Sequence, residues 1–304
     1  FIPSACGGRG SCGLCKVKVT SDVGDHLPTE LPWLDDNERK ENVRLSCQLK
    51  IKKDAAIQIP EELFNDKEFE CEVRSIVDLT HDIKEITLSL KEPARMKFKA
   101  GQFIQFEVPE YELTSERVYR AYSISSQPSR DGEIELEIRL VPSGICTTYV
   151  FEHLKVGDAV TINGPYGHFY LQDTDAKIIF VAGGTGNAPI KSILNDMLEK
   201  DIQREAVYFF GARSKCDLFL VEEMREMEKK LPNFRYVPTL SQPQPGDDWE
   251  GEVGRVTDVI ERKIESGENT EAYLCGSPGM IEAVVEVLKK KGIPEEKIYY
   301  DKFA

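Results

Sequence analysis

The chain has 304 residues, which is enough for two or three domains. Its net charge of −14 argues against nucleic acid or an anionic membrane surface as a partner, because both would repel it. No apolar run is long enough to span a membrane, and there is no signal-peptide pattern. Eight cysteines are too few for a disulfide scaffold, but half of them lie in the first 47 residues, which indicates a local cofactor in a reducing compartment.

The first segment, residues 1–64, is built around cysteines. Cys6, Cys12 and Cys15 follow a C-x5-C-x2-C spacing, and Cys47 comes after 31 intervening residues. This pattern is one residue longer than the plant-type 2Fe-2S pattern, and the glycines between the cysteines let the backbone curl round a cluster. A four-cysteine zinc site is the alternative, but such sites usually show two C-x2-C pairs and only one is present. We therefore expect a 2Fe-2S cluster, and we interpret the following "IQIPEELFNDKEFE" as a linker.

The second segment, residues 65–170, has the pattern of β-structure. In "GEIELEIRLV", apolar and polar residues alternate. Five other short runs have a similar character: "CEVRSIVDL", "DIKEITLSL", "QFIQFEV", "RVYRAYSIS" and "DAVTING". Six short strands separated by Gly and Pro predict a small antiparallel barrel.

The third segment, residues 171–304, alternates strands with helices. The expected strands are "AKIIFVAGG", "EAVYFFGAR", "FRYVPTLS", "EAYLCGS" and "KIYYDKF". The expected helices are "NAPIKSILNDMLEK", "CDLFLVEEMREMEKKL" and "PGMIEAVVEVLKKKG". This order predicts a parallel, doubly wound sheet.

Two strings in the barrel, followed by "GPYGHF" at 164–169, could together hold a flavin dinucleotide. In "RAYSISS", Arg120 can hold a phosphate, Tyr122 can lie against an aromatic ring system, and Ser123 can form a hydrogen bond with a flavin nitrogen. Downstream, "GICTTYVFEHL" opens an apparent short helix, and free N–H groups at a helix start suit a diphosphate. The residues at this opening are Gly144, Thr147 and Thr148.

A further string suits a second dinucleotide. "VAGGTGNAP" lies at a strand-to-helix junction, where Gly183, Gly184 and Gly186 allow a pyrophosphate to approach the backbone. "GARS" at 211–214 and "CGSPGM" at 275–280 end two later strands. Ligands of doubly wound sheets bind at this edge, so we expect the three strings to share one site.

Taken together, "RAYS", "GICTT", "GPYGHF", "GGTGNAP", "GARS" and "CGSPGM" resemble the ferredoxin–NADP reductase superfamily over residues 68–304. With "SACGGRGSCGLCKVKV" and "RLSCQL" in front, the module order is similar to that of the F subunits of sodium-translocating NADH:quinone oxidoreductases. The resemblance implies an α/β plus β fold with three parts. They are a partial 2Fe-2S ferredoxin-like domain with linker (1–64), an FAD-binding β-barrel (65–170) and an NAD-binding domain (171–304).

The resemblance also assigns roles to residues. It places FAD on Arg120, Ala121, Tyr122, Ser123, Arg139, Gly144, Cys146, Thr147 and Thr148. It places NADH on Gly183, Gly184, Thr185, Gly186, Arg213, Cys275 and Gly276. Ser123, beside the flavin N5, Cys275 and the near-terminal aromatic Phe303, which covers the flavin ring, would act at the reacting atoms.

The expected function is electron transfer. NADH would give a hydride to FAD, and single electrons would pass to the 2Fe-2S cluster and onward in a respiratory NADH:quinone oxidoreductase. Partners would be an electron-accepting protein or membrane subunits of a larger complex. The chain would be cytoplasmic, or held at the cytoplasmic face of the inner membrane through an anchor preceding Phe1. The alternatives are an oxygenase reductase and a non-catalytic regulatory subunit. The chain lacks the long insertion that these F subunits carry in the flavin domain, and its four histidines are expected to form no cluster.

Overall fold

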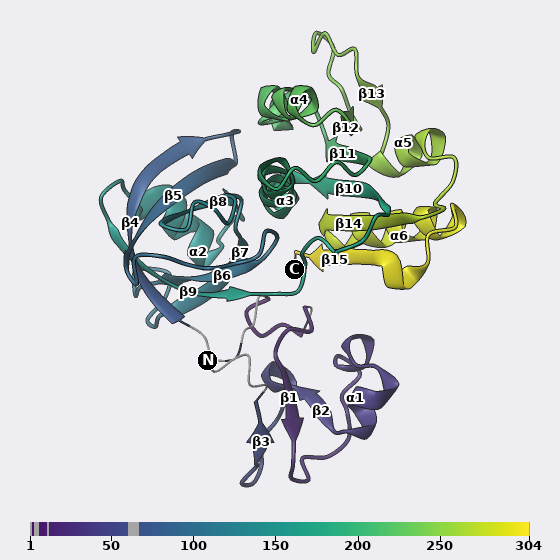
Figure 1. Ribbon diagram of the computed structural model, residues 1–304. Coiled ribbons are helices and arrows are strands. Elements are labelled where there is room, and N and C mark those ends of the chain that lie inside the picture. Colours follow the sequence, from purple (N-terminus) through teal and green to yellow (C-terminus); the bar gives the residue numbers. More distant parts are fainter. Residues whose placement is uncertain (1, 3–5, 11, 60–66, 304) are drawn as a thin grey trace.

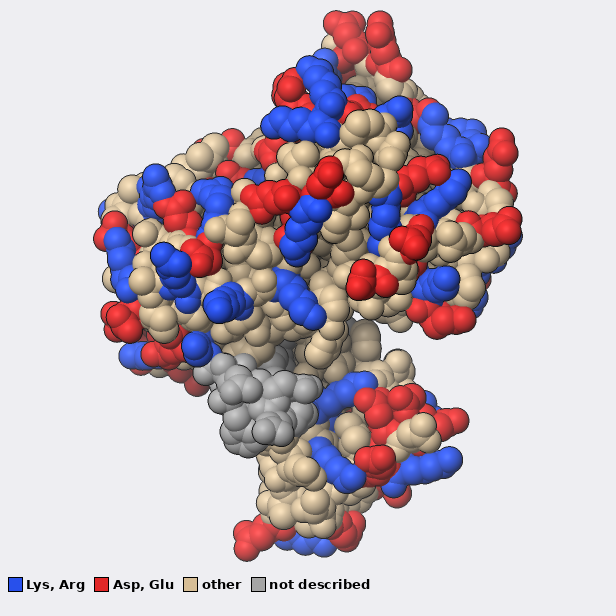
Figure 2. All heavy atoms as spheres, in the orientation of Figure 1, with Lys and Arg blue, Asp and Glu red and all other residues tan. Residues whose placement is uncertain are grey.

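The computed structural model describes residues 2, 6–10, 12–59 and 67–303. This part of the chain forms three β-sheets (Figure 1). A three-stranded sheet lies at the bottom of the view, a curled antiparallel sheet at the left, and a parallel sheet with helices on both faces at the right. On the face shown in Figure 2, acidic and basic side chains are interspersed over all three parts.

The first sheet has the order β2-β1-β3, with β1 at Lys16–Val19, β2 at Val43–Leu45 and β3 at Ile57–Gln58. Helix α1 (Asp36–Lys40) begins with a capping box between Asp35 and Glu38. Strand β3 lies in the stretch that the sequence analysis interprets as linker, so that interpretation is wrong at these residues. Ile57 and Gln58 are both exposed, and a two-residue edge strand leaves no hydrophobic pattern to detect.

A buried ion pair holds the segment that carries Cys47. Arg44, on β2, donates to Glu30 at 2.6 Å, and both side chains are almost completely buried. The N–H groups of Leu27 and Leu45 also donate to the Glu30 carboxylate, at 2.7 and 3.0 Å. Burial opposes ionisation of Glu30, but Arg44 and these two N–H groups hold its pKa below the ordinary value. The pair fixes the end of β2, and Cys47 follows in the 3-10 turn Ser46–Gln48.

The second sheet has the order β7-β6-β9-β4-β5-β8 and is antiparallel throughout. Its strands are β4 (Lys67–Asp78), β5 (Ile83–Glu92), β6 (Phe103–Val108), β7 (Val118–Ser123), β8 (Glu133–Arg139) and β9 (Ala159–Tyr166). An isolated bridge between Ile124 and Leu136 brings the two edges together around an apolar interior. The expected six-stranded barrel is confirmed. Helix α2 (Ile145–Thr148) continues as a π-helical turn over Tyr149–His153.

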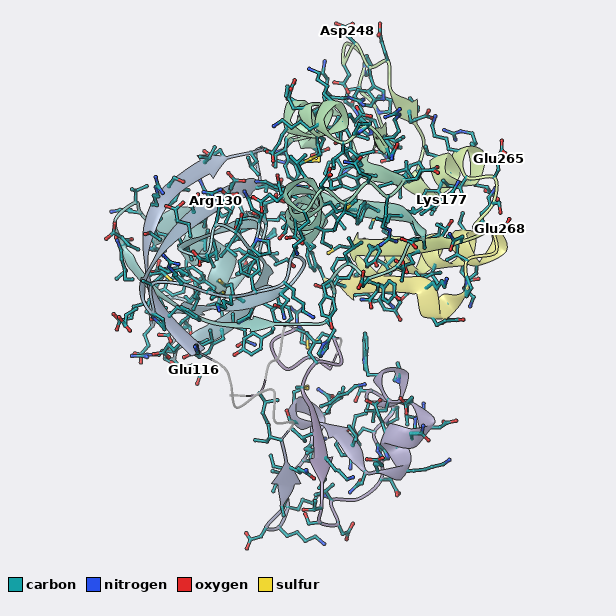
Figure 3. All side chains as sticks on the ribbon, in the orientation of Figure 1. Glu116, Arg130, Lys177, Asp248, Glu265 and Glu268 are labelled. Carbon is teal, nitrogen blue, oxygen red and sulfur yellow. The ribbon has the colours of Figure 1, made fainter. Side chains whose placement is uncertain are left out.

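The third sheet has the order β13-β12-β11-β10-β14-β15, and every pair is parallel. Its strands are β10 (Lys177–Gly183), β11 (Ala206–Ala212), β12 (Phe234–Leu240), β13 (Glu252–Val253), β14 (Thr270–Gly276) and β15 (Ile298–Lys302). Helices α3 (Asn187–Glu199) and α4 (Val221–Lys230) cover one face, and α5 (Val256–Lys263) and α6 (Pro278–Lys290) cover the other. The doubly wound prediction is confirmed. The loop between β12 and β13 projects from this domain, with Asp248 at its tip (Figure 3).

Helix α4 begins later than the sequence predicts. The expected helix starts at Cys216, whereas the structure has a 3-10 turn over Lys215–Asp217 and begins α4 at Val221. The Asp217 carboxylate accepts hydrogen bonds from the N–H and hydroxyl of Ser214, at 2.9 and 2.7 Å, and so closes a separate turn. Leu220 then takes a left-handed conformation with φ 53°, which interrupts any helix from Cys216.

Candidate functional site

One cavity of about 720 Å³ lies where the three domains meet. The cysteine loop contributes Cys6, Arg9 and Cys12, the barrel contributes the end of β7 and the start of α2, and the nucleotide domain contributes the ends of β10, β14 and β15. In Figure 1 the loop before β1 rises from below toward the C-terminus, which lies at the junction of the barrel and the parallel sheet. The volume is in the range that small-molecule sites occupy in proteins. Side chains far apart in the sequence are thereby assembled around one space.

Most of the predicted flavin residues line this cavity. They are Arg120, Ala121, Tyr122, Ser123, Arg139, Gly144, Cys146 and Thr147, whereas Thr148 is not among the lining residues. Arg120 donates to the carbonyl of its neighbour Tyr119 at 2.8 Å. A Cβ on Gly144 would lie 2.7 Å from the Thr147 hydroxyl oxygen, so only glycine leaves the local turn intact. The two predicted strings thus form one wall.

The nucleotide wall contains Gly183, Gly184, Thr185 and Gly276. Gly186 lies beneath it and is buried, and a Cβ there would be 2.2 Å from the Cys275 carbonyl oxygen. The structure therefore gives Gly186 a packing role that lets the 3-10 turn Gly184–Gly186 approach β14. This close approach shapes the turn at which a dinucleotide is expected.

Besides Gly186, two further predicted nucleotide residues lie outside the cavity lining. Cys275 is completely buried, and burial, with the charges of Asp301 and Glu137, raises the pKa of its thiol far above the ordinary value. Arg213 follows β11 and donates from Nε to Gln242 at 2.9 Å. Their assigned contacts with NADH stay predictions.

The four predicted metal ligands form two pairs, each of neighbouring thiols. The sulfur atoms of Cys15 and Cys47 are 3.2 Å apart, and Cys12 lies beside Cys6. Burial, followed by the neighbouring thiol, raises the pKa of Cys12 to about 11 and that of Cys15 to about 12. A bound metal replaces such protons, and four thiols are the donor set of a 2Fe-2S cluster. The residues present therefore fit the group.

The glycines of the loop have the backbone that the sequence analysis expects. Gly7, Gly8, Gly10 and Gly13 all have positive φ angles between 62° and 87°. Gly7 is also packed against the flavin wall, because a Cβ there would lie 3.0 Å from Cζ of Arg120 and 3.1 Å from its Nη1. The cysteine loop and the predicted phosphate-binding arginine are thus in direct contact.

The C-terminal residues close the cavity. Asp301, Lys302 and Phe303 all line it. Phe303 follows the last residue of β15, donates its backbone N–H to Gly276 at 2.9 Å, and packs against the apolar core of the nucleotide domain. Its ring is half-buried, so it has both a core contact and a cavity face. Burial raises the pKa of Asp301 to about 6.

Several lining residues carry no recognisable signal in the sequence, and of these Glu137 is buried most deeply. Glu137 is 3% exposed, and it occupies one of the polar positions of the alternating string "GEIELEIRLV". The alternation predicts an outward-facing side chain, and it does face out of the barrel interior. Helix α3 of the nucleotide domain covers that outer position, and no local sequence signal indicates this.

The structure brings one histidine against side chains of another domain, a contact that the sequence did not predict. His81, in the hairpin between β4 and β5, meets Cys216 and Asp217 of the nucleotide domain. The ligand atoms of the three side chains lie within 4.8 Å of one another. The contact joins two domains and could not be inferred from spacing in the sequence.

Three family models match consecutive parts of the chain. The 2Fe-2S iron-sulfur cluster binding domain matches residues 1–52, the oxidoreductase FAD-binding domain matches 70–170, and the oxidoreductase NAD-binding domain matches 180–286. Among solved structures, the Amycolatopsis cytochrome P450 reductase GcoB has a TM-score of 0.81 at 29% identity, covering 100% of this chain and 90% of that one. The ferredoxin reductase in carbazole 1,9a-dioxygenase has a TM-score of 0.76 at 27% identity, covering 100% and 89%.

The fold, the shared cavity and these matches define an NADH-oxidising flavoprotein with a 2Fe-2S domain, built on the ferredoxin reductase fold. The F subunit of the Na(+)-translocating NADH-quinone reductase from Neisseria meningitidis is 38% identical, covering 100% of this chain and 84% of its own length. Its counterpart from Idiomarina loihiensis has the same identity and coverage. The chain belongs to this family of F subunits. The alignment spans 343 positions, whereas this chain has 304 residues. At least 39 residues of the relative therefore have no counterpart in this chain, as expected for a missing insertion.

Proposed function

We propose that this chain carries electrons from NADH through FAD to its own 2Fe-2S cluster across the single cavity described above, and delivers them to further subunits of an NADH:quinone oxidoreductase. The observation that supports this path is the shared lining. Cys6 and Cys12 face the same space as Arg120, Ser123 and the nucleotide turn, so no further protein carrier is needed between the donor and the cluster. FAD, when bound, accepts a two-electron hydride and releases single electrons.

Each wall has a defined task in this proposal. Arg120 would bind a phosphate oxygen through its guanidinium, a charge-assisted contact that positions the flavin. Ser123 is 4% exposed and sits at the end of β7, where its hydroxyl can hold the ring system in register. Gly183 and Gly184 would let the pyrophosphate of NADH approach the protein backbone. This would position the nicotinamide so that its reacting atom comes within about 3–3.5 Å of the flavin. Phe303 would exclude water and yield its place to the nicotinamide.

The relatives' name indicates a larger complex, and this chain's partners in it are part of the proposal. We place the chain at the cytoplasmic face of the membrane, where it would hand electrons to membrane subunits. Among the helices that the structure describes, none combines the length and apolar character that crossing a bilayer requires.

One observation favours a second candidate, the reductase of an oxygenase system. Two solved structures that cover this chain completely, at 29% and 27% identity, carry the names of a P450 reductase and of a dioxygenase ferredoxin reductase. The alignment gaps also separate this chain from its F-subunit relatives. In that case the same cavity would serve the same chemistry, with an oxygenase component as the acceptor.

The ultraviolet–visible spectrum, with iron and flavin quantification, tests the proposed cofactors, and an NADH–ferricyanide assay tests turnover. We expect one FAD and two irons per chain and rapid ferricyanide reduction by NADH. A protein that binds flavin but does not oxidise NADH would contradict the proposal and favour a regulatory role. Co-purification from the source membrane with quinone reductase subunits would separate the first candidate from the oxygenase reductase.

A further inference from the structure

Among the residues that the structure describes, only one of the two carboxyl oxygens of the buried Glu137 has a hydrogen-bond partner. Asn187, at the start of α3, donates from Nδ2 to Glu137 Oε1 at 2.8 Å. The hydroxyl of Tyr208 donates to the Asn187 carbonyl oxygen at 2.9 Å, which fixes the orientation of the amide. Because Oε1 accepts this hydrogen bond, a proton on Glu137 resides on Oε2. Oε2 is buried, has no hydrogen-bond partner among the residues that the structure describes, and belongs to a residue that lines the cavity.

The cations around Glu137 are already engaged by other carboxylates. Lys191, one turn after Asn187 on α3, bonds Glu85 at 2.7 Å and Glu135 at 3.3 Å. Arg130, on the barrel (Figure 3), bonds Glu135 and Glu133. Glu85 lies directly opposite Glu137 in the pairing of β5 with β8. A negative charge on Glu137 is therefore placed among carboxylates that already share the available cations.

The other titratable groups that face Glu137 come from four further elements. Glu223 of α4, Tyr208 of β11 and Cys275 of β14 interact electrostatically with Glu137, and Asp301 of β15 lines the same cavity. Burial raises the pKa of Glu137 to about 8. Lys191 and the Asn187 hydrogen bond oppose this rise, and Glu85 and Glu223 add to it. The group is thus poised to change its protonation when the charge in the cavity changes.

We propose that Glu137 is a redox-linked proton carrier, whose carboxylate takes up one proton from solvent when hydride transfer adds negative charge to the cavity, and releases it when the electrons leave. The inference rests on the proposed function. NADH and FAD exchange one hydride, NAD⁺ leaves with its positive charge, and one unit of negative charge stays with the flavin. The proton bonds to Oε2, the oxygen without a protein partner. When two electrons pass on to the cluster and its acceptor, the proton returns to water.

Glu137→Gln is the direct test, because an amide keeps the shape and the acceptor for Asn187 but does not titrate. The midpoint potential of the flavin couple is measured spectroelectrochemically from pH 6 to pH 10 in the holoprotein. One additional proton changes the equilibrium tenfold per pH unit, which is about 30 mV for a two-electron couple. In the wild type, the plot of midpoint potential against pH should become steeper by this amount in an interval that begins near pH 8. This extra slope should be absent in Glu137→Gln.

Two further measurements keep the outcome specific. Asp301→Asn should retain the extra slope above pH 8, since Asp301 titrates lower; loss of the slope in this variant alone would assign the proton to Asp301 and overturn the proposal.

Proton uptake during anaerobic photoreduction in weak buffer should be higher in the wild type than in Glu137→Gln, by up to one proton per flavin at pH 9. If Glu137→Gln does not retain FAD, the wild type decides: no steepening between pH 8 and pH 10 contradicts the proposal. A protein that binds no FAD would instead contradict the proposed function.

Discussion

A methyl group at Gly7 should separate the cysteine loop from the flavin wall. In Gly7→Ala the new Cβ would lie 3.0 Å from the Arg120 Cζ. Carbon atoms in contact normally sit about 3.5–4.0 Å apart, so the loop or the guanidinium must shift by a few tenths of an ångström. The φ of 62° adds about 1–2 kcal/mol of backbone strain for a residue with a side chain. The substitution therefore acts on both the loop and Arg120.

Gly8→Ala is the matched control. Gly8 has a φ of 87°, so alanine there is strained as well, but the nearest atom to its Cβ would be Cβ of Cys47 at 3.9 Å, an ordinary contact. Both variants should lose about 1–2 kcal/mol of stability. Only Gly7→Ala should misplace Arg120, whose charge-assisted hydrogen bond to FAD is worth about 1.5–3 kcal/mol when intact.

We expect the apparent Kd for FAD to rise about tenfold in Gly7→Ala, which corresponds to about 1.4 kcal/mol, and to change less than threefold in Gly8→Ala. Flavin fluorescence titration measures the Kd, and stopped-flow mixing with NADH measures how fast the cluster follows the flavin. Cluster reduction should be slower in Gly7→Ala alone. Equal FAD affinity and equal cluster reduction in the two variants would refute the contact between loop and flavin wall as a functional feature.

Three other substitutions or comparisons test the remaining assignments. Arg120→Ala should weaken FAD binding by about 10- to 150-fold, the equivalent of one charge-assisted hydrogen bond, and an unchanged flavin stoichiometry after gel filtration would remove the assignment. NADH should be strongly preferred over NADPH, because Lys215 is bonded to the carbonyl of Asp247 at 2.7 Å in an acidic loop; equal kcat/KM for the two nucleotides would contradict this. Phe303→Ala should keep FAD but tighten nucleotide binding and slow nucleotide release in stopped-flow experiments, whereas wild-type kinetics with a Tm lowered by several degrees would make Phe303 a core residue only.

The large features of the fold were predictable because they depend on local patterns. The alternation of apolar and polar residues along β8 indicates a strand. The continuous apolar run of β10, which ends at Gly183 and Gly184, indicates a buried strand followed by a turn. The element boundaries were less predictable where side-chain hydrogen bonds compete with helix formation, as at Ser214 and Asp217 before α4. Strand β3 was missed because both of its residues are exposed.

The site was predictable in its motifs but not in the contacts between domains. Arg120 and Ser123 stand in a string that suggests a flavin, and the structure places both at the cavity. Glu137 carried no such signal, because its burial is produced by α3, which belongs to another domain. The packing of Gly7 on Arg120 and the meeting of His81 with Cys216 have the same origin. Tertiary contacts between segments distant in the chain leave no periodic trace in a single sequence.

The path from NADH to the cluster is tested most directly by anaerobic rapid mixing of the holoprotein with NADH. Flavin absorbance and the electron paramagnetic resonance signal of the cluster are followed together, in the wild type and in Cys47→Ser. In the wild type the flavin absorbance should fall first and the signal of the reduced cluster should follow. Cys47→Ser should keep the flavin phase and lose the cluster phase. A wild-type cluster that stays oxidised while the flavin is fully reduced would contradict electron transfer across the shared cavity.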